Sequence, residues 1–185
     1  MRRRAFLKLG LAGVGAVSVL GPEAVARAAA PTADSEPRRL ILHNLHTAEK
    51  LDAVYWEEGR YVSDAVAAMD KVLRDYRTGA EHPIDLRLFD LLHEVHGKLG
   101  ATQPFQVISG YRSPQTNAVL HERSHQVASG SLHMQGMAID VRIDGVGLDH
   151  LHRAALGERA GGVGLYPTSN FVHMDVGRVR QWSGS

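Results

Sequence analysis

The most constraining feature of this sequence is the charge and hydropathy pattern of residues 1–28, because it differs from that of the rest of the chain. Residues 1–28 carry five basic residues and one acidic residue, whereas the rest of the chain has a net charge of −3. An uncharged apolar run, residues 9–20, follows the basic start, and small residues around Ala28 follow that run. This order is typical of a secretory signal peptide that is removed after export.

The first residues also indicate the export route. Arg3, Arg4 and the residues up to Lys8 resemble the signal that is read by the twin-arginine translocase. The apolar run is too short to span a bilayer comfortably. We therefore predict a twin-arginine signal peptide over residues 1–28, a partnership with that translocase, export to the periplasm, and no membrane anchor after cleavage. A basic amphipathic anchor or an uncleaved membrane helix is the alternative.

The remaining residues predict one folded domain. Residues 29–39 are rich in Ala, Pro and charge, which is typical of a flexible lead-in, and residues 40–185 suffice for a single domain. The chain has no Cys, which excludes disulfides, cysteine zinc fingers, iron–sulfur clusters and thiol nucleophiles. Its net charge of only +1 argues against a nucleic-acid binder.

The apolar pattern predicts an α+β fold. Helices are expected from a Ser63 cap to Gly79, from an Asp85 cap to Gly100, from Ser113 to the loop at 123–132, and over residues 148–157. Short strands are expected at residues 40–42, 54–56, 105–108, 138–143, 163–165 and 171–176. This order favours a small, mainly antiparallel sheet with flanking helices.

Two of the predicted strands carry polar side chains in a pattern that indicates metal chemistry. In residues 138–143, Asp140 faces away from the core positions, and His133 precedes it by seven residues. In residues 171–176, His173 and Asp175 share one face, about 6.5–7 Å apart along the strand. Two His and one carboxylate form a common catalytic zinc shell. Buried, hydrogen-bonded polar residues are the alternative interpretation.

Several motifs in the same order resemble one known family. His133, Asp140 and His173 stand at the ligand positions of the zinc D-Ala-D-Ala carboxypeptidase and murein endopeptidase family, whose fold is hedgehog-like. The segments SGYRS at 109–113, GGVGLYP at 161–167 and FVHMD at 171–175 are similar to those of its murein endopeptidase K subgroup. The likeness extends from about residue 40 to residue 182.

This resemblance implies a site and an activity. One Zn²⁺ would be held by His133, Asp140 and His173. Arg112 would bind a substrate carboxylate, and Ser131 would position the peptide or the zinc shell. The implied reaction is hydrolysis of stem-peptide cross-links in peptidoglycan. The alternatives are a D,D-carboxypeptidase acting on the same peptides, a non-catalytic zinc-containing module that binds the wall, and a partner of other wall enzymes.

The residue that would act as general base stays open. Many members of the family carry an acidic residue or His three or two positions before the last zinc ligand, where this chain has Asn170 and Phe171. Asp175 is expected either to accept the proton of the attacking water or to orient His173. His125, in the polar loop before the first ligand, is the second candidate base.

Overall fold

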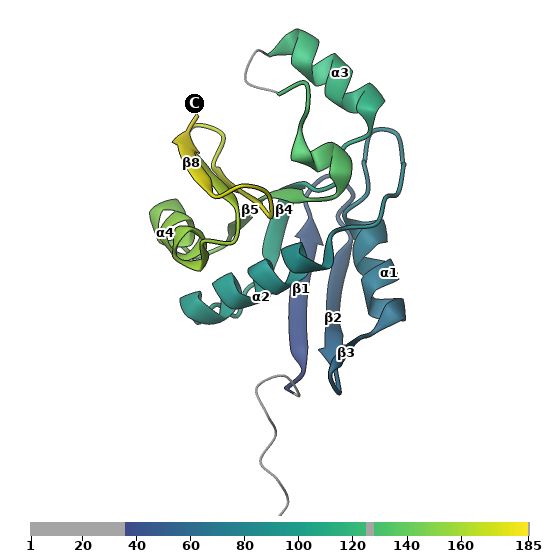
Figure 1. The fold of residues 1–185 in the computed structure, drawn as a ribbon, viewed down its shortest axis with the longest axis vertical. Helices are drawn as coiled ribbons and strands as arrows, with labels where there is room; N and C mark the ends of the chain where they lie inside the picture. The colour runs from purple at the N-terminus through teal and green to yellow at the C-terminus, as the bar shows by residue number, and fades with distance from the viewer. Residues whose placement is uncertain (1–35, 125–127, 185) are drawn as a thin grey trace, which may run out of the picture. The chain divides into compact units, whose positions relative to one another are not determined.

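The computed structural model describes residues 36–124 and 128–184. The predicted signal peptide, most of the predicted lead-in and His125 lie outside these residues. Within them, the chain forms eight strands and four α-helices, which confirms the predicted α+β class (Figure 1). None of the helices in this part of the chain is long and apolar enough to cross a membrane.

The eight strands form one sheet in the order β3-β2-β1-β4-β5-β7-β6-β8. The β1–β4 and β6–β8 pairs are parallel and the other neighbours are antiparallel, so the sheet is mainly antiparallel, as predicted. The strands are β1 (Arg38–Asn44), β2 (Lys50–Glu57), β3 (Arg60–Tyr61), β4 (Phe105–Ser109), β5 (Ala138–Ile143), β6 (Gly162–Tyr166), β7 (Phe171–Asp175) and β8 (Arg180–Ser183).

Local capping explains where two of the helices begin and end. Before α2, the Asp85 side chain accepts a hydrogen bond from the Arg87 backbone N–H, and Gly100 ends the helix with a φ of 56°. Ser113 caps α3 in the same way, as predicted. The helices are α1 (Ser63–Val72), α2 (Leu86–Leu99), α3 (Pro114–Arg123) and α4 (Leu148–Glu158), with a short 3₁₀ helix, η2 (Leu132–Gln135).

One apolar core joins the sheet to three of the helices. Buried side chains of α1, α2 and α4 belong to the same cluster as Val141 of β5 and Met174 of β7. Figure 1 shows α2 and α4 side by side, with α3 standing apart from them. Because side chains alternate along a strand, the faces of β5 and β7 opposite this core carry Asp140 and His173.

The first strand and the first helix differ from the sequence prediction. β1 begins at Arg38, inside the predicted lead-in, because Arg38 forms an ion pair with Asp90 at 2.8 Å and pairs with Trp56 in the ladder. The prediction that Ser63 caps α1 is wrong, since Val62 occupies the cap position and no side chain caps the helix.

The predicted end of α1 at Gly79 is also wrong, and the reason matters for the site. The helix stops at Val72, and the carbonyl oxygen of Leu73 accepts a hydrogen bond from the Tyr111 backbone N–H at 2.7 Å. Asp75 accepts hydrogen bonds from both the backbone N–H and the hydroxyl of Ser113. These residues serve as a support for the loop that follows β4 instead of continuing the helix.

Candidate functional site

The three predicted metal ligands come together from three different elements. Asp140 of β5 lies directly opposite His173 of β7 in the antiparallel ladder, and His133 reaches them from η2. Gly136 bends the chain between η2 and β5 with a φ of 67°, and a Cβ there would overlap the carbonyl oxygen of Pro83. All three ligand candidates are buried, and one potential ligand atom from each lies within 4.8 Å of the others.

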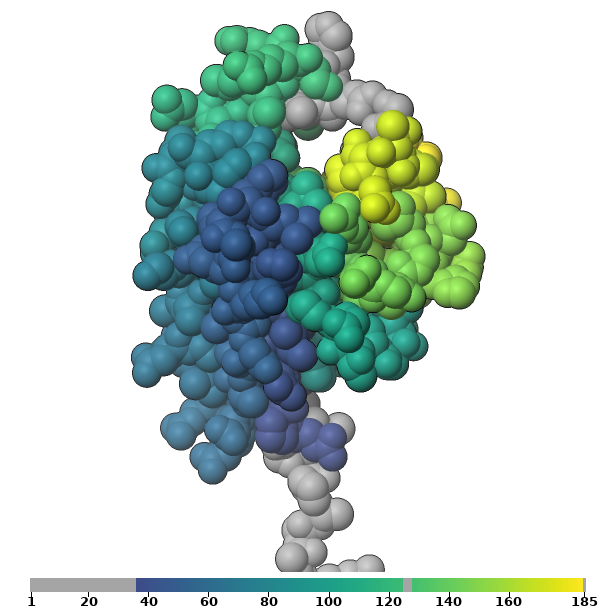
Figure 2. All heavy atoms as spheres, turned by 180° about the vertical axis from the view of Figure 1, so that it is seen from behind, coloured from purple at the N-terminus to yellow at the C-terminus, as the bar shows by residue number. Residues whose placement is uncertain are grey.

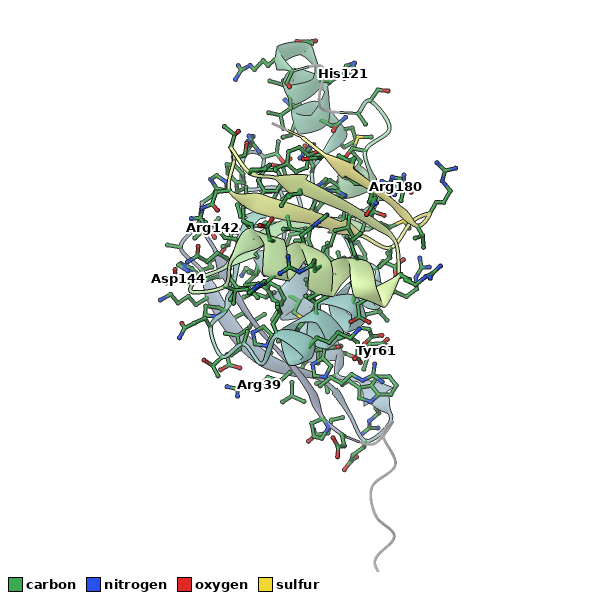
Figure 3. All side chains as sticks on the ribbon, turned by 90° about the vertical axis from the view of Figure 1, so that its left-hand side faces the viewer. Arg39, Tyr61, His121, Arg142, Asp144 and Arg180 are labelled. Carbon is green, nitrogen blue, oxygen red and sulfur yellow. The ribbon has the colours of Figure 1, made fainter. Side chains whose placement is uncertain are left out.

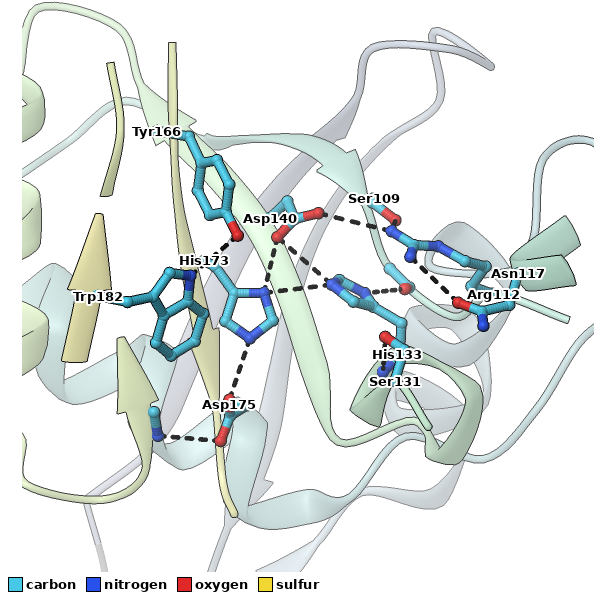
Figure 4. Close-up of polar contacts among 12 residues, drawn as sticks. Ser109, Arg112, Asn117, Ser131, His133, Asp140, Tyr166, His173, Asp175 and Trp182 are labelled. Atoms are coloured by element: carbon cyan, nitrogen blue, oxygen red, sulfur yellow. Dashed lines mark hydrogen bonds and ion pairs between the residues drawn. The ribbon is translucent and has the colours of Figure 1, made fainter. Parts of the chain in front are cut away.

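Hydrogen bonds fix which nitrogen of each imidazole faces the centre (Figure 4). His133 Nδ1 lies 2.7 Å from the carbonyl oxygen of Gly110, which can only accept, so this nitrogen is the donor. His173 Nε2 lies 3.0 Å from Asp175 Oδ2 and donates to that carboxylate. The other two nitrogens, His133 Nε2 and His173 Nδ1, therefore point their lone pairs inward, toward Asp140.

These inward-facing atoms form a close triangle. His133 Nε2 lies 3.3 Å from His173 Nδ1 and 3.3 Å from Asp140 Oδ1, and His173 Nδ1 lies 2.9 Å from Asp140 Oδ1. Three lone pairs at such distances need a cation or a proton between them. A tetrahedral Zn²⁺ with bonds of about 2.0–2.1 Å holds its ligands about 3.3 Å apart and leaves one position open for water. The donor set therefore fits a divalent metal ion.

The charges of the triad also favour a cation at this point. Burial opposes the ionisation of Asp140, but the neighbouring His133 and His173 hold the pKa of its carboxyl well below the usual range. Burial likewise opposes the protonation of His173, yet hydrogen bonds to Asp140 and Asp175 raise the pKa of His173 to about 9. The centre thus attracts positive charge, which a proton or a metal ion can supply.

Asp175 lies behind His173 and is 0% exposed. Its Oδ1 accepts hydrogen bonds from the backbone N–H groups of Gly162 and Gly177, its Oδ2 accepts one from His173, and Arg180 donates to both oxygens. Burial opposes its ionisation, but these donors hold the pKa of Asp175 well below the usual range. Because both oxygens of Asp175 already accept hydrogen bonds, the geometry favours a role in orienting His173 over a role as general base.

Arg112 approaches the centre from the other side, on the loop after β4. Its guanidinium makes two long hydrogen bonds of 3.4 Å, to Ser109 and Asn117, and lies 3.9 Å from Asp140 Oδ2. The side chain is only 11% exposed, its Nε has no hydrogen-bond partner among the described residues, and burial lowers its pKa. A buried guanidinium with unused donors is suited to bind a carboxylate.

Ser131 caps the 3₁₀ helix that carries His133. Its hydroxyl oxygen accepts a hydrogen bond from the His133 backbone N–H at 3.4 Å, and the residue also lines the cleft. The carbonyl oxygen of His133 accepts one from the Arg112 backbone N–H at 3.1 Å, which joins the arginine loop to η2. The predicted substrate and ligand residues on this side are therefore physically linked.

A cleft of about 420 Å³ contains the triad and Arg112. One side is formed by Ser124 and by residues 128–131, and the other by β6, β7 and β8. Figure 2 shows a hollow between α3 and the C-terminal strand, and Figure 3 labels His121 on α3 and Arg180 on β8. Asp140 is the one carboxylate among the described residues that line this cleft.

The β8 wall of the cleft was not predicted from the sequence. Gly162 and Gly164 of β6 pair with Arg180 and Trp182 of β8, and a Cβ at either glycine would overlap the side chain of its partner. Alternate glycines on one strand face make room for two large side chains. They are the sequence signal that could have pointed to this wall.

Asn170 and Phe171 are the two positions at which many members of the family carry a candidate base. Asn170 lies in the turn before β7 with a φ of 56°. Phe171 lines the cleft and stacks on Tyr166, with ring centroids 4.5 Å apart. The second candidate base, His125, lies outside the described residues.

The chain is similar to known peptidases over most of its length. Residues 32–182 match the model of the peptidase family described as Peptidoglycan L,D-endopeptidase MepK. The protein of that name in Escherichia coli strain K12 is 44% identical over 180 residues, which are 97% of this chain and 96% of that protein. A probable peptidoglycan L,D-endopeptidase MepK of Haemophilus influenzae is 38% identical over 183 residues, 98% of this chain and 96% of that protein. The chain therefore belongs to the Peptidoglycan L,D-endopeptidase MepK family of peptidases.

Proposed function

We propose that this chain is an exported, zinc-dependent endopeptidase that hydrolyses L,D cross-links between the stem peptides of peptidoglycan. The observation that carries the proposal is the triangle of inward-facing lone pairs, 2.9–3.3 Å on a side, in the same cleft as an arginine with unused donors. Membership of the MepK family supports the peptidoglycan cross-link as the substrate.

One Zn²⁺ per chain is the proposed cofactor, with His133 Nε2, Asp140 Oδ1 and His173 Nδ1 as its ligands. Bound zinc lowers the pKa of its water to about 7 and polarises the scissile carbonyl group. Asp175 accepts a hydrogen bond from His173 Nε2, and the carbonyl oxygen of Gly110 accepts one from His133 Nδ1. The opposite nitrogen of each ring therefore directs its lone pair to the proposed metal position.

Arg112 is proposed to bind a carboxylate of the stem peptide. An L,D cross-link is an amide between a carbonyl group on an L-configured carbon of one stem peptide and an amine on a D-configured carbon of the other. The D-configured carbon also carries a free carboxylate, which therefore lies next to the scissile bond. Arg112 lies 3.9 Å from Asp140, so a carboxylate held by its guanidinium stays beside the metal ligands. The planar fork of Arg matches two carboxylate oxygens, which Lys cannot reproduce.

Export to the periplasm by the twin-arginine route is part of the proposal, because residues 1–28 have the order of such a signal and the proposed substrate lies outside the cytoplasm. Replacement of Arg3 and Arg4 by Lys tests this route. We expect the double variant to accumulate in the cytoplasm, and unchanged delivery to the periplasm would overturn the assignment.

The activity is tested by incubating the purified full-length chain with sacculi and with defined cross-linked muropeptide dimers, followed by mass spectrometry. We expect conversion of L,D-cross-linked dimers to monomers, loss of this activity with a chelator, and its return with Zn²⁺. Dimers that stay intact after zinc is restored would refute the proposal.

The same experiment separates the alternatives. A D,D-carboxypeptidase would remove one D-Ala from pentapeptide monomers and leave dimers intact, and a binding module would sediment with sacculi without releasing products.

Arg112→Gln is expected to raise KM for the dimer with metal content unchanged. Arg87→Gln is the matched control, since Arg87 is exposed on α2 and pairs with Asp85.

A further inference from the structure

Tyr166 presents a hydroxyl group to the cleft whose proton is not donated to any described residue. The indole Nε1 of Trp182 lies 2.9 Å from the Tyr166 hydroxyl oxygen. An indole N–H can only donate, so Tyr166 is the acceptor in this pair and its own proton remains free. Both residues line the cleft that contains His133, Asp140 and His173.

The Tyr166 ring is packed against two neighbours. It stacks on Phe171 at 4.5 Å with an interplanar angle of 19°, and it lies so close to Gly184 that a Cβ there would overlap the ring. Phe171 therefore packs against Tyr166 at one of the two positions where many members of the family carry an acidic residue or His.

Trp182 is fixed on the same side of the sheet. Its ring fills the slot above Gly164, where a Cβ would overlap it, and lies 5.1 Å from the His173 ring, centroid to centroid. Figure 4 shows the Trp182 ring beside the His173 ring, with the indole N–H directed to the Tyr166 hydroxyl. The tyrosine hydroxyl is therefore tied to the metal-ligand strand through one indole ring.

We propose, resting on the proposed function, that Tyr166 donates a hydrogen bond to the scissile carbonyl oxygen as negative charge develops on it. Tyr166 is then a catalytic residue that keeps its proton and forms no covalent bond. Trp182 is a positioning residue, because its N–H occupies the hydroxyl oxygen and turns the free O–H toward the substrate. Fixed donors aimed at developing charge are among the strongest contributors to catalysis.

Two conservative variants and their combination test this assignment. Tyr166→Phe removes the hydroxyl and is expected to lower kcat by about 100-fold with little change in KM, as for loss of one oxyanion donor. Trp182→Phe keeps an aromatic ring and removes the N–H, and should lower kcat by about 10-fold, the effect of one lost hydrogen bond. Because Trp182 acts through Tyr166, the double variant should match Tyr166→Phe alone.

A second measurement does not depend on turnover. A phosphinate analogue of the cross-link places two oxygens on a tetrahedral phosphorus in place of the scissile carbonyl carbon, and Tyr166→Phe should weaken its binding by the same factor as kcat/KM, with metal content unchanged. Trp56→Phe is the control for loss of an indole, since Trp56 lies on β2 beside Arg38, outside the cleft lining.

Two results would overturn the inference while leaving the proposed function intact. One is a Tyr166→Phe protein with wild-type kcat and wild-type affinity for the phosphinate. The other is a double variant in which the two effects multiply, because Trp182 would then act independently of Tyr166. A wild-type protein that cleaves no cross-link would instead refute the proposed function, and with it the role of Tyr166.

Discussion

The candidate centre has two halves that are held in different ways. In the strand half, Asp140 and His173 lie opposite each other on β5 and β7, so the sheet ladder sets their separation. Asp175, two residues along the same strand, fixes the ring of His173. The separation of Asp140 and His173, and the strand face that they share with Asp175, follow from strand alternation and one antiparallel pairing.

In the loop half, Arg112 and His133 lie on a loop and a single 3₁₀ turn. Their positions depend on segments that are distant in sequence, chiefly the stretch after α1, where Asp75 accepts hydrogen bonds from Ser113. The carbonyl oxygen of Gly110 then fixes the ring of His133. The strand half is therefore set by regular structure, and the loop half by a few buried polar contacts.

This difference predicts different consequences of mutation. Changes in the strand half should act first on metal binding, because the ladder keeps the fold while the ligand geometry is lost. Changes in the support of the loop half should act first on stability. Substitutions in the two halves therefore separate their roles.

The largest effect is expected for His173→Ala in the strand half. Loss of a direct ligand should lower metal affinity by more than the 10–100-fold that follows loss of an outer partner, and should abolish hydrolysis. Metal per chain after dialysis, measured by mass spectrometry, checks this. His93→Ala on α2 is the control. A His173→Ala protein that keeps one tightly bound metal would exclude the proposed ligand set.

Asp175→Asn tests how the strand half orients its ligand. The variant keeps the shape of the side chain but weakens the hold on His173 Nε2, and metal affinity should fall by about 10–100-fold. A chelator competition titration measures the change. Unchanged metal affinity together with lost hydrolysis would instead assign Asp175 as the general base.

Asp75→Asn tests the support of the loop half. Burial opposes ionisation of this carboxyl, but hydrogen bonds from Ser113 and Thr116 lower the pKa of Asp75 to about 2 from its ordinary 3.8. Because the pKa is lower in the folded state, the ionised carboxylate stabilises the protein by about 2–3 kcal/mol above pH 4, and this is lost as the pH falls toward 2.

Urea unfolding at several pH values measures this contribution. The wild type should lose stability between pH 4 and pH 2, whereas Asp75→Asn should be less stable at pH 7 and should show a smaller loss over the same interval. Equal stability of the two proteins at pH 7 would show that Asp75 does not support the loop.

The smallest effect is expected for Ser131→Ala. Its hydroxyl makes one long hydrogen bond, 3.4 Å, to the backbone N–H of His133, and loss of such a cap costs about 1 kcal/mol or less. Thermal unfolding and steady-state kinetics should show a small loss of stability with KM almost unchanged. A large rise in KM at unchanged stability would assign Ser131 to the substrate instead.

The sequence predicted the strand half well because its signals are local. Alternation over residues 138–143 and 171–176 placed Asp140, His173 and Asp175 on the faces away from the core, and the structure has them there. Asp85 and Gly100 marked the limits of α2 for the same reason, since a cap acts within a few residues of the helix end.

The rest could not be predicted because it depends on contacts between distant residues. α1 ends at Val72 since Leu73 and Asp75 bind the loop at 110–113, which no local pattern indicates. The β8 wall arises from a parallel pairing with β6. Gly164 is needed there because the Trp182 ring lies against it, and this contact is not visible in the local sequence.

Two fixed imidazole rings and one carboxylate aim their lone pairs at a single point. A crystal structure of the zinc-loaded protein, with anomalous scattering measured at the zinc edge, tests this arrangement most directly. We predict one ion bound by His133 Nε2, Asp140 Oδ1 and His173 Nδ1 at about 2.0–2.2 Å, with His173 Nε2 still donating to Asp175. An ion bound elsewhere, or a His173 ring turned so that Nε2 binds the metal, would contradict the account.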